Sequence, residues 1–235
     1  MNLKNKKYLC IIPARAGSQG IKNKNIKILD GMPLVEHTIK FSKKIEKYFD
    51  VVVSTNSKKV LSIAKKYQLT GLELRPENLS GNNSLTIDVV KYELKILEKK
   101  NKKKYEAVLL LQPTVPYRRI QDINIALKKI QSTSYDSVVS IKNVEGFHPL
   151  RMKIKKKKYI VNYSSEKKEN MKPRQKLPKV FLRSGSIYMI KRRSMINLNS
   201  MVGQKVYGLE QSGKFTINID TNLDLFLAKN KNKYL

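Results

Sequence analysis

The first apolar segment of the chain runs directly into a loop of glycines and cations. Residues 8–12 are almost wholly apolar, which suits a strand buried on both faces of a parallel sheet, and Pro13 ends it. The loop that follows contains two glycines and three cations, which are Arg15, Gly17, Gly20, Lys22 and Lys24. Glycine lets the backbone approach a ligand closely, and loop N–H groups beside cations can hold phosphate groups. The spacing therefore predicts a polyphosphate site.

The same loop also has a plainer interpretation. It contains neither the G-x-G-x-x-G of dinucleotide-binding folds nor the G-K-[ST] of P-loops. A tight turn beneath a solvated patch of lysines would explain it without a ligand. Both interpretations remain open from the spacing.

Alternating strand and helix patterns place this loop at the edge of a predicted sheet. Apolar runs predict strands at residues 48–54, 107–111 and 136–141, and helical spacing covers residues 33–45, 57–67, 87–97 and 120–130. This order predicts an α/β fold in which helices cover both faces of a mostly parallel sheet. Such sheets bind ligands at the carboxyl ends of their strands. We expect Ser84 or Thr86 to cap the third helix, with Asp88 at its positive end.

Other predicted strand ends also carry polar residues. Arg75 and a proline follow a possible short strand at residues 72–74, and Gln112 opens the rigid corner QPTVPYR. Arg174 and Arg183 lie in the segment PRQKLPKVFLRSGSIYMI, and the planar fork of arginine suits a carboxylate. Ordinary strand-ending turns and a generally cationic surface are the alternative interpretations of these residues.

Four segments together resemble the acylneuraminate cytidylyltransferases, which join CMP to sialic acid and related nonulosonic acids. They are IPARAGSQGIKNKNIKILDGMPLVEHTI, QPTVPYR, PRQKLPKVFLRSGSIYMI and FTINIDTNLDLFLAKN. The resemblance covers almost the whole chain. It implies a Rossmann-like fold of the nucleotide-diphospho-sugar transferase type. It also implies transfer of CMP from CTP to the anomeric hydroxyl of a nonulosonic acid, with release of pyrophosphate, for surface polysaccharide or glycoconjugate biosynthesis.

The resemblance also implies a role for individual residues. Those expected at the nucleotide are Ala14, Arg15, Gly17, Ser18, Lys24, Asn25, Arg75, Ser84 and Thr86. Those expected at the acidic sugar are Gln112, Lys142, Arg174 and Arg183. Arg15, Gln19 and Asp220 are the expected catalytic residues, and Asp220 with Asn218 would hold Mg²⁺. One or two carboxylates with water suffice for this hard cation.

Two positions depart from the family pattern. Gln19 stands where the family usually has a lysine near the triphosphate, and Asn218 stands where it has the first aspartate of D-I-D-T. The first change removes a positive charge and the second a negative one, so that the net charge is unchanged. Asp224 is expected to begin the last helix rather than to bind the metal.

The composition restricts the classes of partner. The net charge of +31, from 49 Lys and Arg against 18 Asp and Glu, raises the question of a nucleic-acid partner. Because aromatic residues do not interleave with the lysine clusters, nucleic-acid binding is not favoured. The single cysteine, Cys10, belongs to the predicted first strand and excludes a disulfide framework within the chain. The polar amino terminus and the lack of a long apolar run predict a cytoplasmic protein without membrane contact.

Residues 1–235 are expected to form one nucleotidyltransferase domain with an antiparallel excursion at about residues 142–175. In the resembling family this region packs against a second subunit, so a homodimer is implied. His37 and His148 are expected to be structural rather than catalytic. Two alternatives to the main hypothesis remain: the same chemistry on 3-deoxy-octulosonate, legionaminic or pseudaminic acid, and a catalytically impaired homologue that binds a nucleotide or polyanion.

Overall fold

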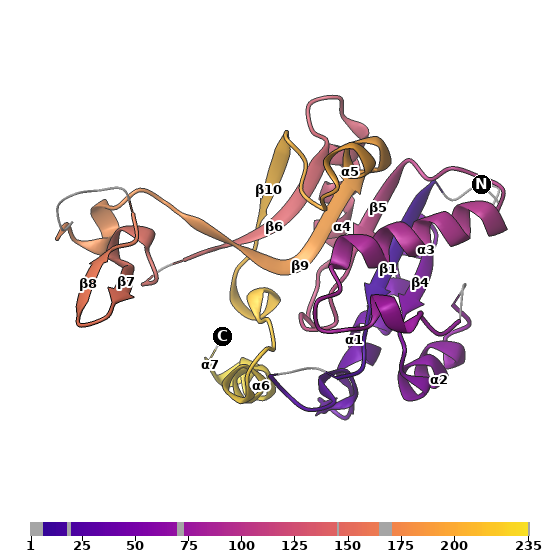
Figure 1. Ribbon diagram of the computed structural model, residues 1–235, viewed down its shortest axis with the longest axis horizontal. Helices are drawn as coiled ribbons and strands as arrows, with labels where there is room; N and C mark the ends of the chain where they lie inside the picture. The colour runs from indigo at the N-terminus through magenta and orange to yellow at the C-terminus, as the bar shows by residue number, and fades with distance from the viewer. Residues whose placement is uncertain (1–6, 18–19, 70–72, 145, 165–170, 235) are drawn as a thin grey trace.

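The computed structural model describes residues 7–17, 20–69, 73–144, 146–164 and 171–234. Its centre is a six-stranded sheet in the order β10-β6-β9-β5-β1-β4 (Figure 1). The strands are β1 Tyr8–Pro13, β4 Phe49–Ser54, β5 Ala107–Leu110, β6 Ser137–Asn143, β9 Phe181–Lys191 and β10 Val206–Glu210. Only the pairings of β9 with β5 and β6 are antiparallel within this sheet. The predicted α/β class with a mostly parallel sheet is therefore confirmed.

Helices cover both faces of the sheet because successive side chains of a strand point to opposite faces. In β1, Cys10 and Ile12 pack on the side of α1 Leu34–Lys43, α2 Lys58–Lys66 and α4 Ile120–Gln131. Leu9 and Ile11 pack on the side of α3 Thr86–Lys100 and α5 Arg192–Leu198. All four β1 side chains are completely buried. Burial raises the pKa of the Cys10 thiol to about 12, so that this cysteine is an inert core residue, as predicted.

The sheet brings distant loops to one edge. β1 is parallel to β4 and β5, so the residues that follow Pro13, Ser54 and Leu110 leave the sheet on the same side. β9 is antiparallel to β5, and its first residues therefore reach this edge as well. The glycine loop, the QPTVPYR corner and the beginning of β9 consequently surround the same space.

The segment between β6 and β9 extends away from the sheet. We call its described residues, 146–164 and 171–180, the arm; it stands apart from the helices and the sheet in Figure 1. It contains η3 Pro149–Arg151, the antiparallel pair β7 Lys153–Lys156 and β8 Tyr159–Asn162, and η4 Arg174–Lys176. His148 has the structural role that was predicted, because its Nε2 donates to the carbonyl of Pro178 at 3.0 Å and its Nδ1 accepts from Leu150.

The carboxyl-terminal segment returns to the glycine loop. It forms η5 Gly213–Thr216, α6 Asn222–Lys229 and α7 Lys231–Tyr234. A small apolar cluster joins it to the residues around β2 Ile28–Leu29 and β3 Met32–Pro33. In this cluster Ile217 and Ile219 pack with Ile21 and Leu29. The cluster holds the residues before α6 against Ile21 of the glycine loop, which leads into η1 Lys24–Ile26.

One prediction at the start of α3 is wrong. The residue before this helix is Leu85, and neither Ser84 nor Thr86 caps it with a side-chain hydrogen bond. Ser84 instead donates to the carbonyl of Asn78 at 3.3 Å, within the turn that follows η2 Glu77–Leu79, and Thr86 is already the first helical residue. Asp88 does lie in the first turn, as predicted.

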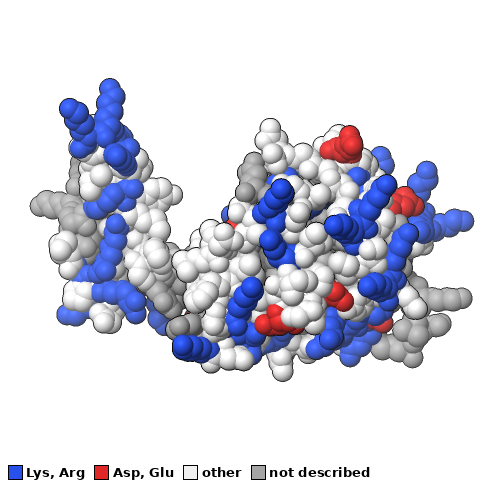
Figure 2. Space-filling view, turned by 90° about the horizontal axis from the view of Figure 1, so that it is seen from below, with Lys and Arg blue, Asp and Glu red and all other residues white. Residues whose placement is uncertain are grey.

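Lys and Arg side chains are spread over the body and the arm, with few Asp or Glu between them (Figure 2). This distribution matches the scattered positions of lysine in the sequence. Within the described residues, no helix combines the length and the apolar character that crossing a bilayer would require.

Candidate active site

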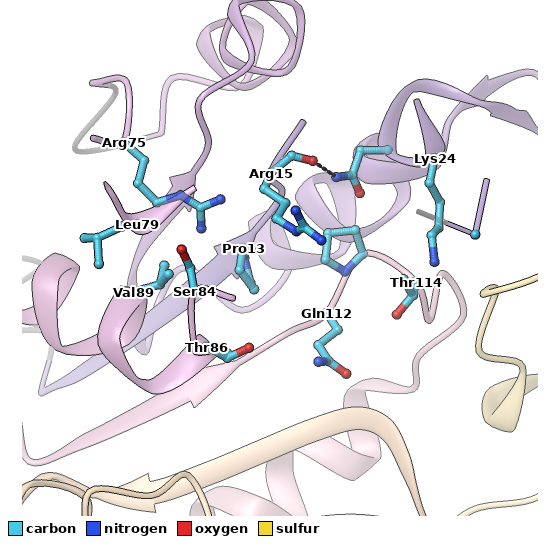
Figure 3. Close-up of a pocket in the computed structure, with 13 residues that line it drawn as sticks. Pro13, Arg15, Lys24, Arg75, Leu79, Ser84, Thr86, Val89, Gln112 and Thr114 are labelled. Atoms are coloured by element: carbon cyan, nitrogen blue, oxygen red, sulfur yellow. Dashed lines mark hydrogen bonds between the residues drawn. The ribbon is translucent and has the colours of Figure 1, made fainter. Parts of the chain in front are cut away.

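A cavity of about 340 Å³ opens at the edge where the glycine loop and QPTVPYR meet (Figure 3). Its lining includes seven of the residues that the resemblance assigns to substrates, namely Arg15, Lys24, Asn25, Arg75, Ser84, Thr86 and Gln112. They come from segments far apart in the chain. Parallel pairing of β1 with β4 and β5 explains why these segments meet.

The start of the glycine loop is clamped to the end of β4. Ala14 is completely buried; its N–H donates to Ser54 O at 2.8 Å, and its carbonyl accepts from Thr55 Oγ1 at 2.7 Å. The N–H of Ala16 donates to Asn56 Oδ1 at 2.8 Å, and Gly17 follows with a φ of +74°. The first half of the loop thus has a defined shape. Ser18, predicted at the nucleotide, and Gln19, predicted as a catalytic residue at the triphosphate, lie outside the described residues.

Two asparagines hold Arg15 over the cavity. Its guanidinium donates to Asn82 Oδ1 at 2.8 Å, and its carbonyl accepts from Asn25 Nδ2 at 2.9 Å. The bond from Asn25 is visible in Figure 3. The side chain of Asn25 therefore stabilises the backbone of the glycine loop. The sequence analysis missed Asn82, whose only signal was its place in the polar run SGNNS after the RP turn.

Arg75 is the most deeply buried cation of this cavity, with 5% of its surface exposed. Its Nε donates to Ser80 Oγ at 3.2 Å, while one of its terminal nitrogens is buried without a partner among the described residues. Burial lowers the pKa of Arg75, and the nearby carboxylate of Glu93 opposes that shift. A buried N–H group that lacks a partner costs free energy. A ligand with a neutral acceptor, such as a carbonyl oxygen of a base, would satisfy it.

Gln112 lies opposite the beginning of β9. A β-carbon at Gly185, whose φ is +81°, would come within 3.0 Å of Gln112 Oε1 and 3.9 Å of Asn218 Cγ. The positive φ favours glycine here, and a β-carbon would also require the end of the Gln112 side chain to shift slightly. The buried guanidinium of Arg118 donates to the carbonyls of Gln112 at 2.6 Å and Ser186 at 3.0 Å. Arg118 therefore ties the QPTVPYR corner to β9, a role that the sequence analysis did not foresee.

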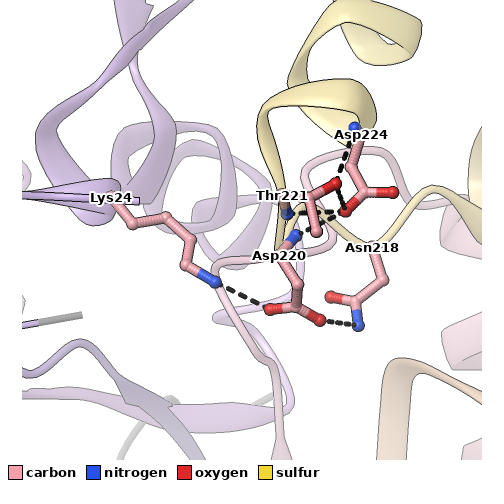
Figure 4. A network of polar contacts seen from close by, with 5 residues as sticks. All are labelled: Lys24, Asn218, Asp220, Thr221 and Asp224. Carbon is pink, nitrogen blue, oxygen red and sulfur yellow. Dashed lines mark hydrogen bonds and ion pairs between the residues drawn. The ribbon is translucent and has the colours of Figure 1, made fainter. Parts of the chain in front are cut away.

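Asp220 forms a polar network beside the glycine loop (Figure 4). Its Oδ1 accepts from Lys24 Nζ at 2.7 Å, and its Oδ2 accepts from Asn218 Nδ2 at 2.8 Å. Gly20 lies so close that an added β-carbon would be only 2.4 Å from the carbonyl oxygen of Asp220. The glycine loop, Lys24 and the residues before α6 are therefore packed together at this edge of the sheet.

The neighbouring carboxylate, Asp224, serves the helix, as the sequence analysis predicted. It accepts from the N–H groups of Asp220 and Thr221, and its own N–H donates to Thr221 Oγ1, which forms a capping box at the start of α6. Burial opposes ionisation of Asp224, but the hydrogen bonds from Thr221 outweigh it and lower the pKa.

The residues around Asp220 can be compared with what Mg²⁺ requires. In the described part of the chain, no group of three or more His, Cys, Asp or Glu residues is arranged to hold a metal ion. Asn218 Oδ1, however, is buried without a hydrogen-bond partner next to the Asp220 carboxylate. One carboxylate and one amide oxygen are hard ligands of the kind that Mg²⁺ uses together with water and phosphate oxygens. The predicted pair thus fits a magnesium ion that also binds a substrate phosphate.

Three residues predicted at the sugar lie outside the lining of this cavity. Lys142, on β6, donates to Thr216 O at 3.4 Å, and its charge also lowers the pKa of Asp224. Arg183 is exposed on β9 opposite Ile141, and Arg174 is exposed in η4 of the arm. Their roles at the sugar remain predictions.

Comparison with known proteins agrees with this geometry. An N-acylneuraminate cytidylyltransferase of Streptococcus agalactiae serotype III is 29% identical over 225 residues, which are 93% of this chain and 51% of that protein. A CMP-N,N'-diacetyllegionaminic acid synthase of Legionella pneumophila is 36% identical over 137 residues, 57% of each chain. This chain thus spans about half the length of the first of these relatives.

A solved structure has the same fold. It is a CMP:2-keto-3-deoxy-manno-octonic acid synthetase in complex with CTP, with a TM-score of 0.65, 17% identity and coverage of 95% of this chain and 97% of that one. The sequence profile of the family described as Cytidylyltransferase matches residues 9–231. The chain that forms this cavity therefore belongs to the cytidylyltransferase family.

Proposed function

We propose that this protein transfers CMP from CTP to the anomeric hydroxyl of a sialic-acid-like nonulosonic acid and releases pyrophosphate. The observation that carries this proposal is the cavity at the carboxyl ends of β1 and β5. Arg15, Lys24 and Arg75 line it without any carboxylate among the described lining residues, and Asp220 lies next to it. A cationic cavity beside one carboxylate suits a triphosphate that binds together with a divalent cation.

Each residue then has a specific task. Arg15 and Lys24 neutralise the triphosphate, and the unpartnered N–H of Arg75 donates to the base, with Ser84 and Thr86 beside it. Asp220 and Asn218 would hold Mg²⁺, which when bound would supply positive charge to neutralise the phosphate groups. Gln112, held by Arg118, contacts the sugar acid. The hydroxyl attacks the α-phosphorus in line, and such transfers are catalysed mainly by positioning and charge neutralisation.

Lys24 has to change partner during this reaction. In the structure, the ammonium group of Lys24 forms an ion pair with Asp220 at 2.7 Å. On binding, the triphosphate would replace Asp220 as the partner of Lys24, which leaves the Asp220 carboxylate free to hold Mg²⁺ together with Asn218. In this exchange each charged group keeps a partner of opposite charge. The buried ammonium group of Lys24 therefore never lacks a counter-ion, which would cost free energy.

We further propose that the protein is a homodimer formed through the arm. A two-stranded ribbon is marginally stable by itself in water. The arm nevertheless exposes large apolar side chains, with 80% of Phe147, 63% of Ile160 and 83% of Met171 accessible. A second copy that covers them would stabilise the ribbon, and light scattering coupled to gel filtration tests this. We place the enzyme in the cytoplasm, where CTP is made, as a step in the biosynthesis of cell-surface sugars.

The experiment that tests the activity measures pyrophosphate release from CTP and Mg²⁺ with a panel of acidic sugars. The panel contains N-acetylneuraminic, legionaminic, pseudaminic and 3-deoxy-octulosonic acids, and the native protein is compared with a Gln19→Lys variant. We expect release with one nonulosonic acid. Release only by the variant would mean that the triphosphate site is intact but lacks a cation at position 19.

If neither the native protein nor the Gln19→Lys variant releases pyrophosphate although both are folded, the enzymatic proposal is rejected. The second candidate function would then be binding of a nucleotide or polyanion without chemistry. The net charge of +31 and the replacements at Gln19 and Asn218 favour that candidate.

A further inference from the structure

A second cationic cavity, of about 550 Å³, lies behind the QPTVPYR corner. Residues 112–114 of this corner line the first cavity, and residues 116–121, from the end of the corner to the start of α4, line the second. Five cations line the second cavity: Lys40 and Lys44 from α1, Arg118 and Arg119 before α4, and Lys214 from η5. Its volume falls within the usual range of small-molecule sites.

The lining of this second cavity contains no carboxylate among the described residues. Lysine is abundant in this protein, so a cationic lining by itself says little. Three other cavities bordered by lysine or arginine, however, each include a glutamate: Glu106, Glu98, or Glu73 together with Glu93. In the second cavity, as in the candidate active site, all the Lys, Arg, Asp and Glu residues among the described lining residues are cations. That likeness points to an anionic ligand.

Arg118 gives the second cavity a buried cation. Only 9% of its surface is exposed, and its guanidinium donates to Gln112 O, Ser186 O and Thr38 Oγ1, none of which carries a charge. Burial lowers the pKa of Arg118 to about 9, so it is still a full cation at neutral pH. A buried charge without a counter-ion is unfavourable. An anion in the cavity would relieve that cost.

One aromatic ring, that of Phe215, contacts two of the other cations. The ring of Phe215 has the guanidinium carbon of Arg119 at 4.8 Å from its centroid and Lys214 Nζ at 5.7 Å. A cation–π contact orients a cation without neutralising its charge. Asp122 pairs with Arg119 at 2.9 Å and reduces its charge, so the electrostatic attraction rests mainly on Lys40, Lys44, Lys214 and Arg118.

We propose that this second cavity binds a compact polyvalent anion that carries phosphate groups. Lysines on α1 and η5 provide flexible point charges for phosphate oxygens, and the guanidinium of Arg118 adds a fixed, buried positive charge to the lining. The same guanidinium holds the backbone of Gln112 at 2.6 Å. Arg118 therefore connects an anion bound in the second cavity to Gln112 in the candidate active site. The other cations of the two cavities are different residues.

Calorimetric titration of inorganic pyrophosphate at physiological ionic strength, without metal, tests this proposal. The native protein is compared with Lys40→Gln/Lys214→Gln, with Arg15→Gln, and with the control pair Lys58→Gln/Lys59→Gln. The control removes the same charge from exposed positions on α2. All four lysines are exposed, so these variants leave the core intact.

We expect the native protein and the control pair to bind two pyrophosphates. Lys40→Gln/Lys214→Gln should weaken one of these sites by about tenfold or more, because close charge pairs dominate such binding. Arg15→Gln should weaken only the other site. Equal affinities for the two lysine pairs, or a single native site that Arg15→Gln abolishes, would overturn the proposal. Because the measurement needs neither CTP nor turnover, its outcome is independent of the proposed transferase activity.

Discussion

The environment of Asp220 shows how one carboxylate can serve both the free and the substrate-bound protein. Its two oxygens accept from Lys24 and Asn218, so the charge is neutralised and oriented before any ligand binds. The one side-chain oxygen of Asn218, Oδ1, is buried and has no hydrogen-bond partner among the described residues. An aspartate at position 218 would repel Asp220, whereas the amide donates to it. Asn218 therefore preserves a metal-compatible oxygen without adding a second negative charge.

Replacing Asp220 by Asn should abolish most of the proposed activity. The variant loses the charge that would bind Mg²⁺ and the counter-ion of Lys24, so we expect pyrophosphate release to fall on the order of 100-fold. Raised Mg²⁺ should restore only part of it. Circular dichroism checks that the fold is kept. Near-native release by a folded Asp220→Asn variant would contradict the assignment.

Gly20→Ala tests the contact between the glycine loop and Asp220. The new β-carbon would be 2.4 Å from the Asp220 carbonyl oxygen, which is backbone, so the loop must move away from Asp220. We expect the KM for CTP to rise by about tenfold or more, because small displacements of positioning groups are costly. Gly146→Ala is the matched control, since nothing lies within 4 Å of its β-carbon position and its φ is not positive. Equal kinetics of the two variants would show that the contact is unimportant.

At the scale of elements, the site depends on how loops leave the sheet. Parallel pairing places the ends of β1, β4 and β5 together, and the antiparallel β9 contributes its beginning to the same edge. The last contribution comes from the segment before α6, which an apolar cluster around Ile217 and Ile219 holds against the glycine loop. The stability of the start of α6 should therefore affect the position of Asp220.

The capping box of α6 provides a stability test at this scale. Thr221→Ala removes the hydroxyl that accepts from the N–H of Asp224, and we expect a loss of about 1 kcal/mol in the free energy of unfolding. Urea denaturation measures it. An exposed substitution on the same helix, Asn222→Ala, should change stability by less than about half that amount. A loss in Asn222→Ala equal to that in Thr221→Ala would contradict the capping role.

The capping carboxylate also predicts a dependence on pH. The pKa of Asp224 is lowered from its usual value of 3.8, so its contribution to stability is complete above that value and is lost as the pH falls through the lower folded pKa. Acid titration of unfolding midpoints should therefore show a smaller acid-induced loss in Asp224→Asn than in the native chain. Identical acid profiles of the two proteins would show that Asp224 does not contribute to the loss of stability in acid.

At the scale of the whole molecule, attraction of polyanions by the net charge of +31 has to be distinguished from substrate binding in the candidate active site. Cations spread over the body and the arm attract any polyanion from a distance, and salt screens this attraction (Figure 2). The candidate active site contains fixed cations close to the substrate, where screening is weaker. The two kinds of binding should therefore respond differently to ionic strength.

A salt titration gives the prediction at this scale. Between 50 and 200 mM salt, binding of a random RNA should weaken by roughly 1000-fold if many lysines contact phosphates. We expect the affinity for CTP with Mg²⁺ to change by less than about tenfold, because only a few charges are involved. Fluorescence anisotropy measures both. A CTP affinity that falls as steeply as RNA binding would favour the non-catalytic polyanion binder.

The sequence alone was sufficient for most of the fold and the family. Strand and helix periodicities are local properties, so β1, β5 and α4 were predicted close to their observed bounds. Once the strands were predicted, the residues that follow them could be placed at the carboxyl edge of the sheet. Arg15, Arg75 and Gln112 were expected there for this reason, and they are found around one cavity. Helix caps were less predictable, because Ser84 had a competing acceptor in Asn78 that the local pattern does not reveal.

Only the tertiary structure decided which of these groups pair. Lys24 and Asp220 are 196 residues apart, and their ion pair depends on the packing of two loops that periodicity cannot register. Among the described residues, the terminal nitrogen of Arg75 without a partner, the buried Arg118 and the cations that line the cavity behind QPTVPYR likewise depend on burial, which is a property of the assembled layers. Local sequence determines the elements through backbone and side-chain periodicity, whereas the electrostatic environment of a side chain depends on whatever the fold brings next to it.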